Sequence, residues 1–310
     1  MPSYSKLGVF LLNERGEKVE RKVLVLGARG MLGQELVKQL KQSGKYTVYG
    51  VGRTDTDICI DLREDEKIKA VFEQNRPDIV INAAANIMID SCEENRGEAY
   101  LINSRLPYIA SRMSEEFNAY YIQISTDHYY CNDGVKKHKE EEGVVLLNEY
   151  AKTKYLGECM SLVNMNSLVV RTNIVGFRKK IGQRTFIEWV VDTLKNNEKI
   201  DVYDDFFTSS MHTVDFSKVL IGLFDYMPTG VVNIASSDVT SKKDFILGVS
   251  QKFFGRIPEY RTISIKEHAG VKRADSLGLD VRKIEAILGI KMPTLEETID
   301  SLYREYLNRS

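Results

Sequence analysis

The segment that decides the fold is "KVLVLGARGMLGQELVKQLKQSG", residues 22–44. Its first residues are branched and apolar, which predicts a buried strand, and the apolar spacing that follows predicts an amphipathic helix ending at Gly44. Gly27, Gly30 and Gly33 stand at the junction. Glycines there allow a tight turn and a close backbone approach, so that the helix N-terminus can face a pyrophosphate. The segment therefore predicts a dinucleotide-binding strand, turn and helix.

The alternation of strand and helix continues to residue 172. Strands are predicted at "YTVYGVG" (46–52), "DIVINAAA" (78–85), "AYYIQIST" (119–126) and "SLVVRT" (167–172), and helices at 64–75, near 97–116 and around Tyr150. Short strands rich in β-branched residues that alternate with helices are typical of a parallel sheet covered on both faces. The predicted fold class is α/β, with a doubly wound parallel sheet of the NAD(P)-binding Rossmann type.

The pattern becomes less regular after residue 172. Helices are predicted near 184–196, 214–226 and 241–254, a strand at "GVVNIA" (230–235), and a last helix that opens on a capping box of Thr294 and Glu297. This part predicts a smaller mixed α/β substrate lobe. The predicted organisation is an N-terminal extension (1–22), a dinucleotide-binding domain (23–176, with 212–236 returning to it) and a substrate-binding lobe (177–211 and 237–310). "NERGEK" (13–18) is interpreted as a polar turn, either in an ordered hairpin or in a mobile arm.

Composition excludes several classes of function. Lys and Arg number 43 against 44 Asp and Glu, a net charge of −1, which gives no field to attract nucleic acid or an anionic membrane. The longest apolar stretch, "IVINAAANIMI" (79–89), is far shorter than the ~20 residues of a membrane span. The four cysteines show no metal-ligand spacing, so no metal site is predicted. Reduced thiols and the lack of a convincing signal peptide predict a cytoplasmic protein.

Two arginines bear on which dinucleotide binds. Arg53 stands twenty residues after Gly33, where an NAD site usually has an acidic residue, and Arg29 lies within the glycine loop. Guanidinium groups pair well with a 2′-phosphate, so NADP(H) is favoured over NAD(H). Alternatively the arginines are surface charges, and Asp55 or Asp57 binds the ribose. Asp61 is interpreted either as an acceptor for the adenine amine or as a helix N-cap.

Tyr150 and Lys154 in "NEYAKTKYLGE" (148–158) are four residues apart at the start of a predicted helix, and so lie on one face. A nearby ammonium favours the phenolate and lowers the pKa of a tyrosine, which suits a proton donor at neutral pH. One YxxxK is also expected by chance in a chain of this size. Thr126 ends a predicted strand, where its hydroxyl can bond a substrate oxygen. The three residues together predict hydride transfer to a ketone.

At this point the chain resembles a known family, the extended short-chain dehydrogenases/reductases, and within it the dTDP-4-dehydrorhamnose reductase group. The motifs that carry the resemblance are "GARGMLG", "RPDIVINAAA", "IDSCEEN", "ISTD" and "LNEYAKTKYLGE", and, more thinly, "FTSSMHTVDFSKVL" and "KRADSLGLDVRKIEAILG". The resemblance implies NADPH-dependent reduction of a 4-keto group on a nucleoside-diphosphate deoxysugar, and suggests a homodimer. It implies Thr126, Tyr150 and Lys154 as the catalytic residues. The cofactor-binding residues expected are Gly27, Arg29, Gly30, Met31, Leu32, Gly33, Arg53, Asp61, Leu62, Ala83, Ala84, Ala85, Asn103, Tyr150 and Lys154.

Departures from the group's pattern keep alternatives open. The usual "STDYVFDG" is here "STDHYYCND", and Ile174 stands where a tryptophan is expected, which indicates a different sugar or base. One alternative is a catalytically silent regulatory subunit, like that of methionine adenosyltransferase. Another is a sugar-nucleotide epimerase or dehydratase. His128 stands where similar dehydratases have Glu, and Asp127 stands where similar epimerase-reductases have Cys. His128 and His212 are interpreted as structural, and Lys272 and Arg273 as a diphosphate contact or a solvated turn.

Overall fold

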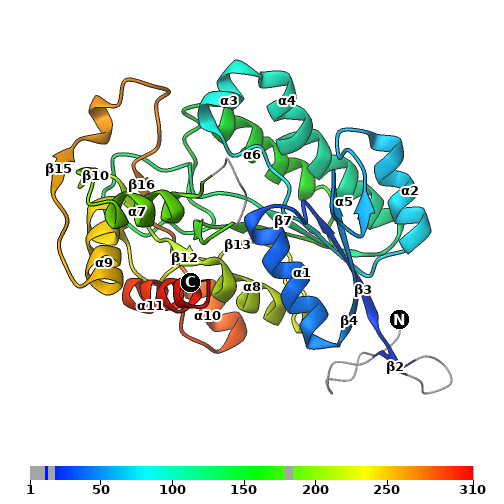
Figure 1. Cartoon of the computed structure of the whole chain (residues 1–310). Coiled ribbons are helices and arrows are strands. Elements are labelled where there is room, and N and C mark those ends of the chain that lie inside the picture. Colours follow the sequence, from blue (N-terminus) through cyan, green and yellow to red (C-terminus); the bar gives the residue numbers. More distant parts are fainter. Residues whose placement is uncertain (1–10, 13–17, 179–183, 310) are drawn as a thin grey trace.

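The structure is a computed structural model that describes residues 11–12, 18–178 and 184–309 (Figure 1). Near the N-terminus, β1 (Leu11–Leu12) and β2 (Lys18–Val19) pair antiparallel. The polar turn predicted at 13–18 falls almost entirely outside the described residues. Among the described residues, no helix combines the length and the apolar character that crossing a bilayer requires.

Seven parallel strands form the central sheet, in the order β13-β8-β7-β6-β3-β4-β5. Their bounds are β3 (Arg21–Leu26), β4 (Tyr46–Gly52), β5 (Ile58–Cys59), β6 (Ile79–Asn82), β7 (Tyr120–Ile124), β8 (Ser167–Arg171) and β13 (Gly230–Asn233). The chain builds outward from β3 in one direction through β4 and in the other through β6. Ligands of such sheets bind beyond the carboxyl ends of the strands at this reversal.

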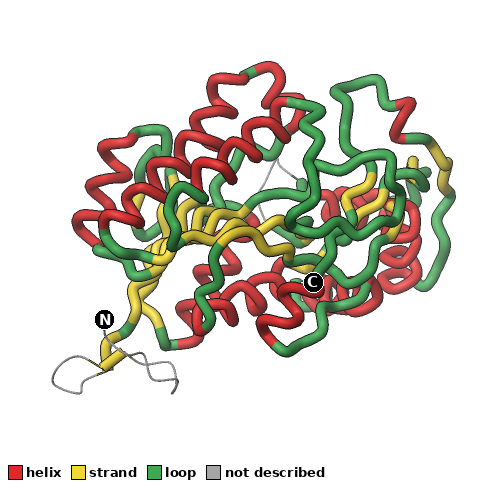
Figure 2. The backbone as a smooth tube through the Cα atoms, turned by 180° about the vertical axis from the view of Figure 1, so that it is seen from behind, coloured by secondary structure: helices red, strands yellow, loops and turns green. Residues whose placement is uncertain are grey.

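Helices cover both faces of the sheet (Figure 2). On one face lie α1 (Met31–Ser43), α8 (Thr213–Gly222) and α10 (Arg282–Leu288); on the other lie α2 (Asp65–Asn75), α5 (Leu106–Glu116) and α6 (Glu149–Ser161). Strand β3 shows why both faces are needed: Val23 and Val25 pack into the α1 core, whereas Leu24 and Leu26 pack into the α2 core. The predicted α/β, doubly wound fold class is confirmed.

The helix predicted near 97–116 is wrong in detail. The chain instead forms α3 (Ile89–Glu94), α4 (Arg96–Tyr100), a π-helical turn (Leu101–Arg105) and α5. Inside the π turn the carbonyl oxygen of Asn103 lies against Gly157 of α6, where a Cβ would be 2.1 Å from it. This close packing, together with the hydrogen bonds of the Asn103 side chain described below, accompanies a helical turn that is wider than an α-helical one. The spacing of apolar residues in the sequence does not indicate such a turn.

The remaining elements form a smaller mixed lobe with its own core, enclosed by α7 (Phe186–Lys195), α9 (Lys242–Phe254) and α11 (Leu295–Leu307). Its short strands are β9 (Ile174–Val175), β10 (Ile200–Tyr203), β11 (Phe207–Thr208), β12 (Met211–His212), β14 (Thr240–Ser241), β15 (Tyr260–Ile263) and β16 (Ser276–Leu277), and it contains the 3-10 turn Ile265–Glu267. Another 3-10 turn, Leu223–Asp225, follows α8 and packs in the core of the central sheet. The capping box of Thr294 and Glu297 is confirmed. The sequence missed these strands because most are two residues long.

Candidate active site

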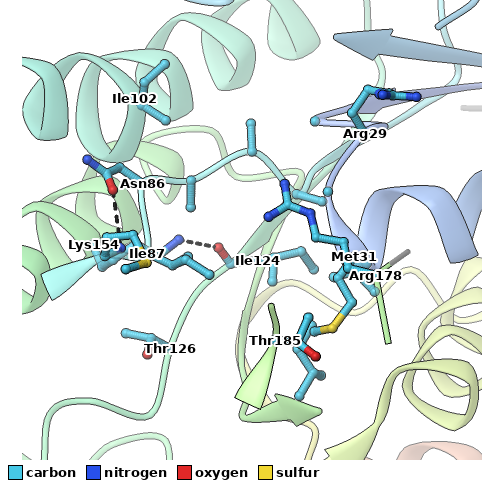
Figure 3. Close-up of a pocket in the computed structure, with 18 of the residues that line it drawn as sticks. Arg29, Met31, Asn86, Ile87, Ile102, Ile124, Thr126, Lys154, Arg178 and Thr185 are labelled. Atoms are coloured by element: carbon cyan, nitrogen blue, oxygen red, sulfur yellow. Dashed lines mark hydrogen bonds between the residues drawn. The ribbon is translucent and has the colours of Figure 1, made fainter. Parts of the chain in front are cut away.

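A cavity of about 1100 Å³ opens at the carboxyl ends of β3, β6 and β7. Most of the predicted site residues line it, namely Gly27, Arg29, Gly30, Met31, Leu32, Arg53, Asp61, Leu62, Ala83, Ala84, Ala85, Thr126, Tyr150 and Lys154. Gly33 and Asn103 are not on its wall. Figure 3 shows Thr126 and Lys154 on one side of the cavity and Arg29 at a distance from them. The cavity is therefore long enough to separate a charged end from the predicted catalytic residues.

The glycine loop is packed too closely for side chains. Gly27 has a φ of +82°, and a Cβ there would lie 2.6 Å from the backbone nitrogen of Ala84. A Cβ on Gly33 would lie 2.2 Å from the Gly27 carbonyl oxygen. The N-cap of helix α1 is Gly30, which supplies no side-chain cap, and the first turn contains no acidic residue. Its first N–H groups, beside the cavity, are thus available to an anion such as the pyrophosphate of a dinucleotide.

We expect Gly33→Ala to destabilise the chain and to weaken dinucleotide binding. The added methyl group meets backbone atoms of the glycine loop, which have no rotamer to change, so an overpacking cost of ~1–3 kcal/mol is expected. The matched control is Gly97→Ala in α4, where a Cβ meets nothing within 4 Å. Urea unfolding and cofactor titration of both variants measure the two effects. Equal stability and affinity in both would contradict the close packing.

At the adenosine end, only some of the predicted carboxylates face the cavity. Asp57 accepts hydrogen bonds from Lys41 (2.8 and 2.9 Å) and from the Gly50 amide (2.8 Å), in a separate hollow. Asp55 pairs with Arg29 at 3.1 Å. Neither arrangement leaves a carboxylate directed at a ribose in the cavity. Arg53 lies exposed on the cavity wall.

Asp61 reaches the cavity, but a neighbour holds both of its oxygens. Arg63 donates to them at 3.0 Å, and this hydrogen bonding lowers the pKa of Asp61 to about 2. Arg63 also pairs with Glu98 at 2.8 Å. The N-cap interpretation of Asp61 is wrong, because the N-cap of α2 is Glu64. Arg63, which also lines the cavity, is a residue that the sequence reasoning missed.

The predicted catalytic residues meet at the end of β7 and the start of α6. The N-cap of helix α6 is Asn148, whose side chain accepts a hydrogen bond from the Ala151 amide, and this cap places Tyr150 in the first turn. The side chain of Thr126 lies near enough to the Tyr150 hydroxyl to lower the pKa of the tyrosine. The Lys154 ammonium donates to the Ile124 carbonyl at 2.7 Å (Figure 3). All three side chains are buried yet line the cavity.

The predicted effect of Lys154 on Tyr150 is wrong. Burial raises the pKa of Tyr150 above its ordinary value, although the nearby Thr126 side chain lowers it. Lys154 is not among the groups that shift this pKa. The reason is geometric, since the ammonium is directed at the Ile124 carbonyl rather than at the phenol. Burial lowers the pKa of Lys154 to about 8. Tyr150 therefore keeps its proton at neutral pH and can donate it.

Asn103 acts behind the cavity wall rather than on it. Its side-chain oxygen accepts from the Asn86 amide at 2.9 Å, and its side-chain nitrogen donates to the Asn86 carbonyl (2.9 Å) and to the Thr153 hydroxyl (3.1 Å). Every hydrogen-bonding position of the side chain except one lone pair is thus occupied. Asn103 fixes Asn86, a cavity residue, instead of making the direct contact predicted for it.

Two further predictions concern histidines and a basic turn. The His212 Nε2 lies 2.8 Å from a carboxylate oxygen of Glu305. Lys272 and Arg273 are absent from the cavity wall, and Arg273 pairs with Asp90 at 3.6 Å. His128 does line the cavity, with its ring 5.5 Å from that of Tyr150.

In the part of the chain that the structure describes, no group of three or more His, Cys, Asp and Glu is placed to hold a metal ion.

Comparison with known proteins places these features in a family. The model of the RmlD substrate binding domain matches residues 21–308. The spore coat polysaccharide biosynthesis protein SpsK of Bacillus subtilis is 30% identical, over 82% of this chain and 91% of that protein. A dTDP-4-dehydrorhamnose reductase of Aggregatibacter actinomycetemcomitans is 26% identical, over 87% and 94%. The solved dTDP-4-dehydrorhamnose reductase of Bacillus anthracis, in complex with NADP, superposes with a TM-score of 0.83 at 23% identity, over 93% of this chain and all of that one.

Proposed function

Because the chain belongs to the RmlD substrate binding domain family, we propose that it reduces a 4-keto group on a nucleoside-diphosphate deoxysugar and uses NADPH for this. The observation that carries the proposal is the cavity itself. One wall is an uncapped helix N-terminus behind a glycine loop, and another is a buried tyrosine that holds its proton. A regulatory subunit has no need of that tyrosine.

The residues present fit a dinucleotide. Its pyrophosphate would lie against the first N–H groups of α1, and its adenosine end would approach Arg53 and Arg29. A bound reduced nicotinamide would supply the hydride. Thr126 would orient the carbonyl group, Tyr150 would donate a proton to its oxygen, and Lys154 would hold the end of β7 through Ile124.

The first experiment is loss of reduced-nicotinamide absorbance with NADPH and NADH in parallel, over a panel of freshly generated 4-keto-6-deoxy nucleotide sugars. We expect turnover with at least one sugar and a preference for NADPH. If the protein bound NADPH tightly but oxidised neither cofactor with any sugar of the panel, this would contradict the reductase and favour the regulatory alternative. Purification with tightly bound NAD would favour the epimerase or dehydratase alternative.

Arg53→Ala tests the cofactor preference. A lost hydrogen bond to a charged group costs ~1.5–3 kcal/mol, so the preference for NADPH over NADH should fall about ten- to a hundredfold. Arg112→Ala is the control, because Arg112 is an exposed arginine of α5 away from the cavity wall, paired with Glu115. The ratio of kcat/KM for the two cofactors is measured. An unchanged ratio in the Arg53 variant would show that other residues bind the 2′-phosphate.

The same proposal extends to partners and location. The nucleotide sugar is proposed as the partner molecule, and a cytoplasmic location is consistent with the four cysteines, all of them free thiols. A homodimer is proposed from the family alone. Sedimentation analysis would measure the oligomeric state.

A further inference from the structure

Arg178 is a basic residue of the cavity wall that the proposed chemistry leaves without a role. It follows β9 of the smaller lobe and lines the cavity together with the glycine loop. Figure 3 shows it beside Met31, with its guanidinium group reaching into the cavity. Met31 is the first residue of α1, whose N-terminus has no side-chain cap. A cation from one lobe therefore lies where the other lobe is proposed to bind a pyrophosphate.

The backbone just before Arg178 packs closely against the two helices nearest to it. A Cβ on Gly176 would lie 3.4 Å from the sulfur of Met31 in α1 and 2.3 Å from the hydroxyl oxygen of Thr213 in α8. The Thr213 hydroxyl also donates to the Val175 carbonyl at 2.9 Å. Gly176 thus lets the chain pass the start of α1 too closely for a side chain, and Arg178 follows two residues after this contact.

Two helices of the smaller lobe hold the same segment. The Arg178 amide donates to a carboxylate oxygen of Glu188 in α7 at 2.6 Å. The Phe177 carbonyl accepts from Arg309 of α11 at 3.1 Å, and the Arg309 guanidinium lies 4.8 Å from the centre of the Phe177 ring. Because this backbone is already fixed, binding of an anion by Arg178 has to order only its side chain, which lowers the entropy cost of the contact.

A pyrophosphate at this place calls for more positive charge than a helix supplies. It carries a negative charge on each phosphate, whereas a helix N-terminus is equivalent to roughly half an elementary charge. Lys154, another cation of the wall, is directed at the Ile124 carbonyl, and Arg53 is expected at the adenosine end. A guanidinium group has the planar fork that donates twice to phosphate oxygens.

From this arrangement, and resting on the dinucleotide binding in the proposed function, we propose that the Arg178 guanidinium binds the pyrophosphate of the cofactor. Cofactor binding then joins the two lobes, since α1 belongs to the dinucleotide-binding domain and Arg178 to the lobe proposed to hold the sugar. The contact does not depend on reduction, because oxidised and reduced cofactors carry the same pyrophosphate. A nucleotide sugar also carries a diphosphate, so the experiment has to separate the two.

The first test is titration of the wild type and Arg178→Met with NADPH and NADH, without any sugar. Loss of a hydrogen bond to a charged group should weaken binding about ten- to a hundredfold, equally for the two cofactors. Unchanged affinity for both would overturn the proposal. So would a loss confined to NADPH, which would assign Arg178 to the 2′-phosphate.

The matched control is Arg184→Met. Arg184 lies on the same wall, but its side chain is 66% exposed and pairs with Asp192 at 3.2 Å. Cofactor affinity should therefore stay within about twofold of wild type, as expected for a screened surface charge. Equal losses in the two variants would overturn the proposal, because the overall charge of the cavity would then explain them.

Two further titrations complete the test. Arg178→Lys keeps the charge but lacks the planar fork, so it should weaken both cofactors equally and less than methionine does. This variant decides the question if Arg178→Met fails to fold, and wild-type affinity in it would overturn the proposal. The probes dTDP and UDP are titrated against the NADP⁺ complex. A loss confined to them would place Arg178 at the diphosphate of the nucleotide sugar and overturn the pyrophosphate contact.

Hydrogen–deuterium exchange tests whether the cofactor joins the lobes. In the wild type, NADPH should slow exchange in the glycine loop and also at the Arg178 amide and the start of α7. In Arg178→Met at saturating NADPH, the slowing should remain in the glycine loop alone. Equal slowing at the start of α7 in both proteins would overturn the link between the lobes.

The outcomes separate this inference from the proposed function. Wild-type protein that binds both cofactors but oxidises neither with any sugar would contradict the reductase alone, because the arginine variants would still decide the pyrophosphate contact. Wild-type protein that binds no dinucleotide would overturn both. Turnover in the wild type together with full cofactor affinity in Arg178→Met would overturn the inference and leave the reductase standing.

Discussion

Replacing Tyr150 with phenylalanine should abolish most turnover while leaving cofactor affinity nearly unchanged. The ring fills the same buried space against Ile89 and Cys92, so the helix start and the cavity wall remain. Only the hydroxyl is lost, and with it the proton donor, which typically contributes a factor of ~10²–10⁴ in rate. The measurements are kcat with the best sugar of the panel and NADPH binding by fluorescence titration.

The control is Tyr155→Phe. Tyr155 belongs to the same helix but packs on the sheet core, away from the cavity wall. Its hydroxyl has no place in the proposed chemistry, so we expect kcat within about twofold of wild type, a difference of less than ~0.5 kcal/mol in the activation barrier. If Tyr150→Phe lost cofactor affinity and turnover in equal measure, Tyr150 would be a binding residue rather than a proton donor.

The largest expected loss of stability follows from Arg171→Ala. Arg171 and Glu158 form an ion pair at 2.8 Å whose side chains are 5% and 2% exposed. Glu158 also accepts from the Ser125 hydroxyl at 2.5 Å. Removing the guanidinium leaves a buried carboxylate without its counter-ion, which typically costs ~3–5 kcal/mol. Urea unfolding measures this free energy.

Arg261→Ala is the matched control for Arg171→Ala. Arg261 also donates twice to one carboxylate, that of Asp201, but on the surface of the molecule. Water and salt screen that pair, so the free energy of unfolding should barely change. Similar losses in both variants would mean that burial does not set the strength of the interior pair.

Local features made the fold and much of the site predictable. The glycine loop, the alternation of strands with helices and the spacing of Tyr150 and Lys154 each depend on neighbours within a few residues, and each lies on the cavity wall or in the sheet as expected. The direction of the Lys154 side chain was not predictable, because the Ile124 carbonyl that holds it comes from strand β7, 30 residues earlier in the chain.

The other misses depend either on side-chain rotamers or on contacts that no local pattern signals. The pairing of Asp61 with Arg63 was not predicted, although the two residues are only two positions apart. The choice between capping a helix and accepting from an arginine depends on side-chain rotamers. Asn103 was assigned to the cofactor, but its partner Asn86 belongs to a loop 17 residues earlier in the chain, beyond the reach of a helical pattern. The Lys242 ammonium lowers the pKa of Asp127 although the two residues lie far apart in the sequence, and no local pattern signals such an interaction.

The last strand of the central sheet also sets the order of events during synthesis. Strand β13 pairs with the edge of β8, yet the segment between them builds much of the smaller lobe (Figure 1). A nascent chain cannot cover that edge until residues 230–233 have left the ribosome. Until then β8 offers unpaired N–H and C=O groups to any other strand, which is the situation that invites aggregation. Because β13 comes late in the chain, this edge of the sheet can be completed only late in synthesis.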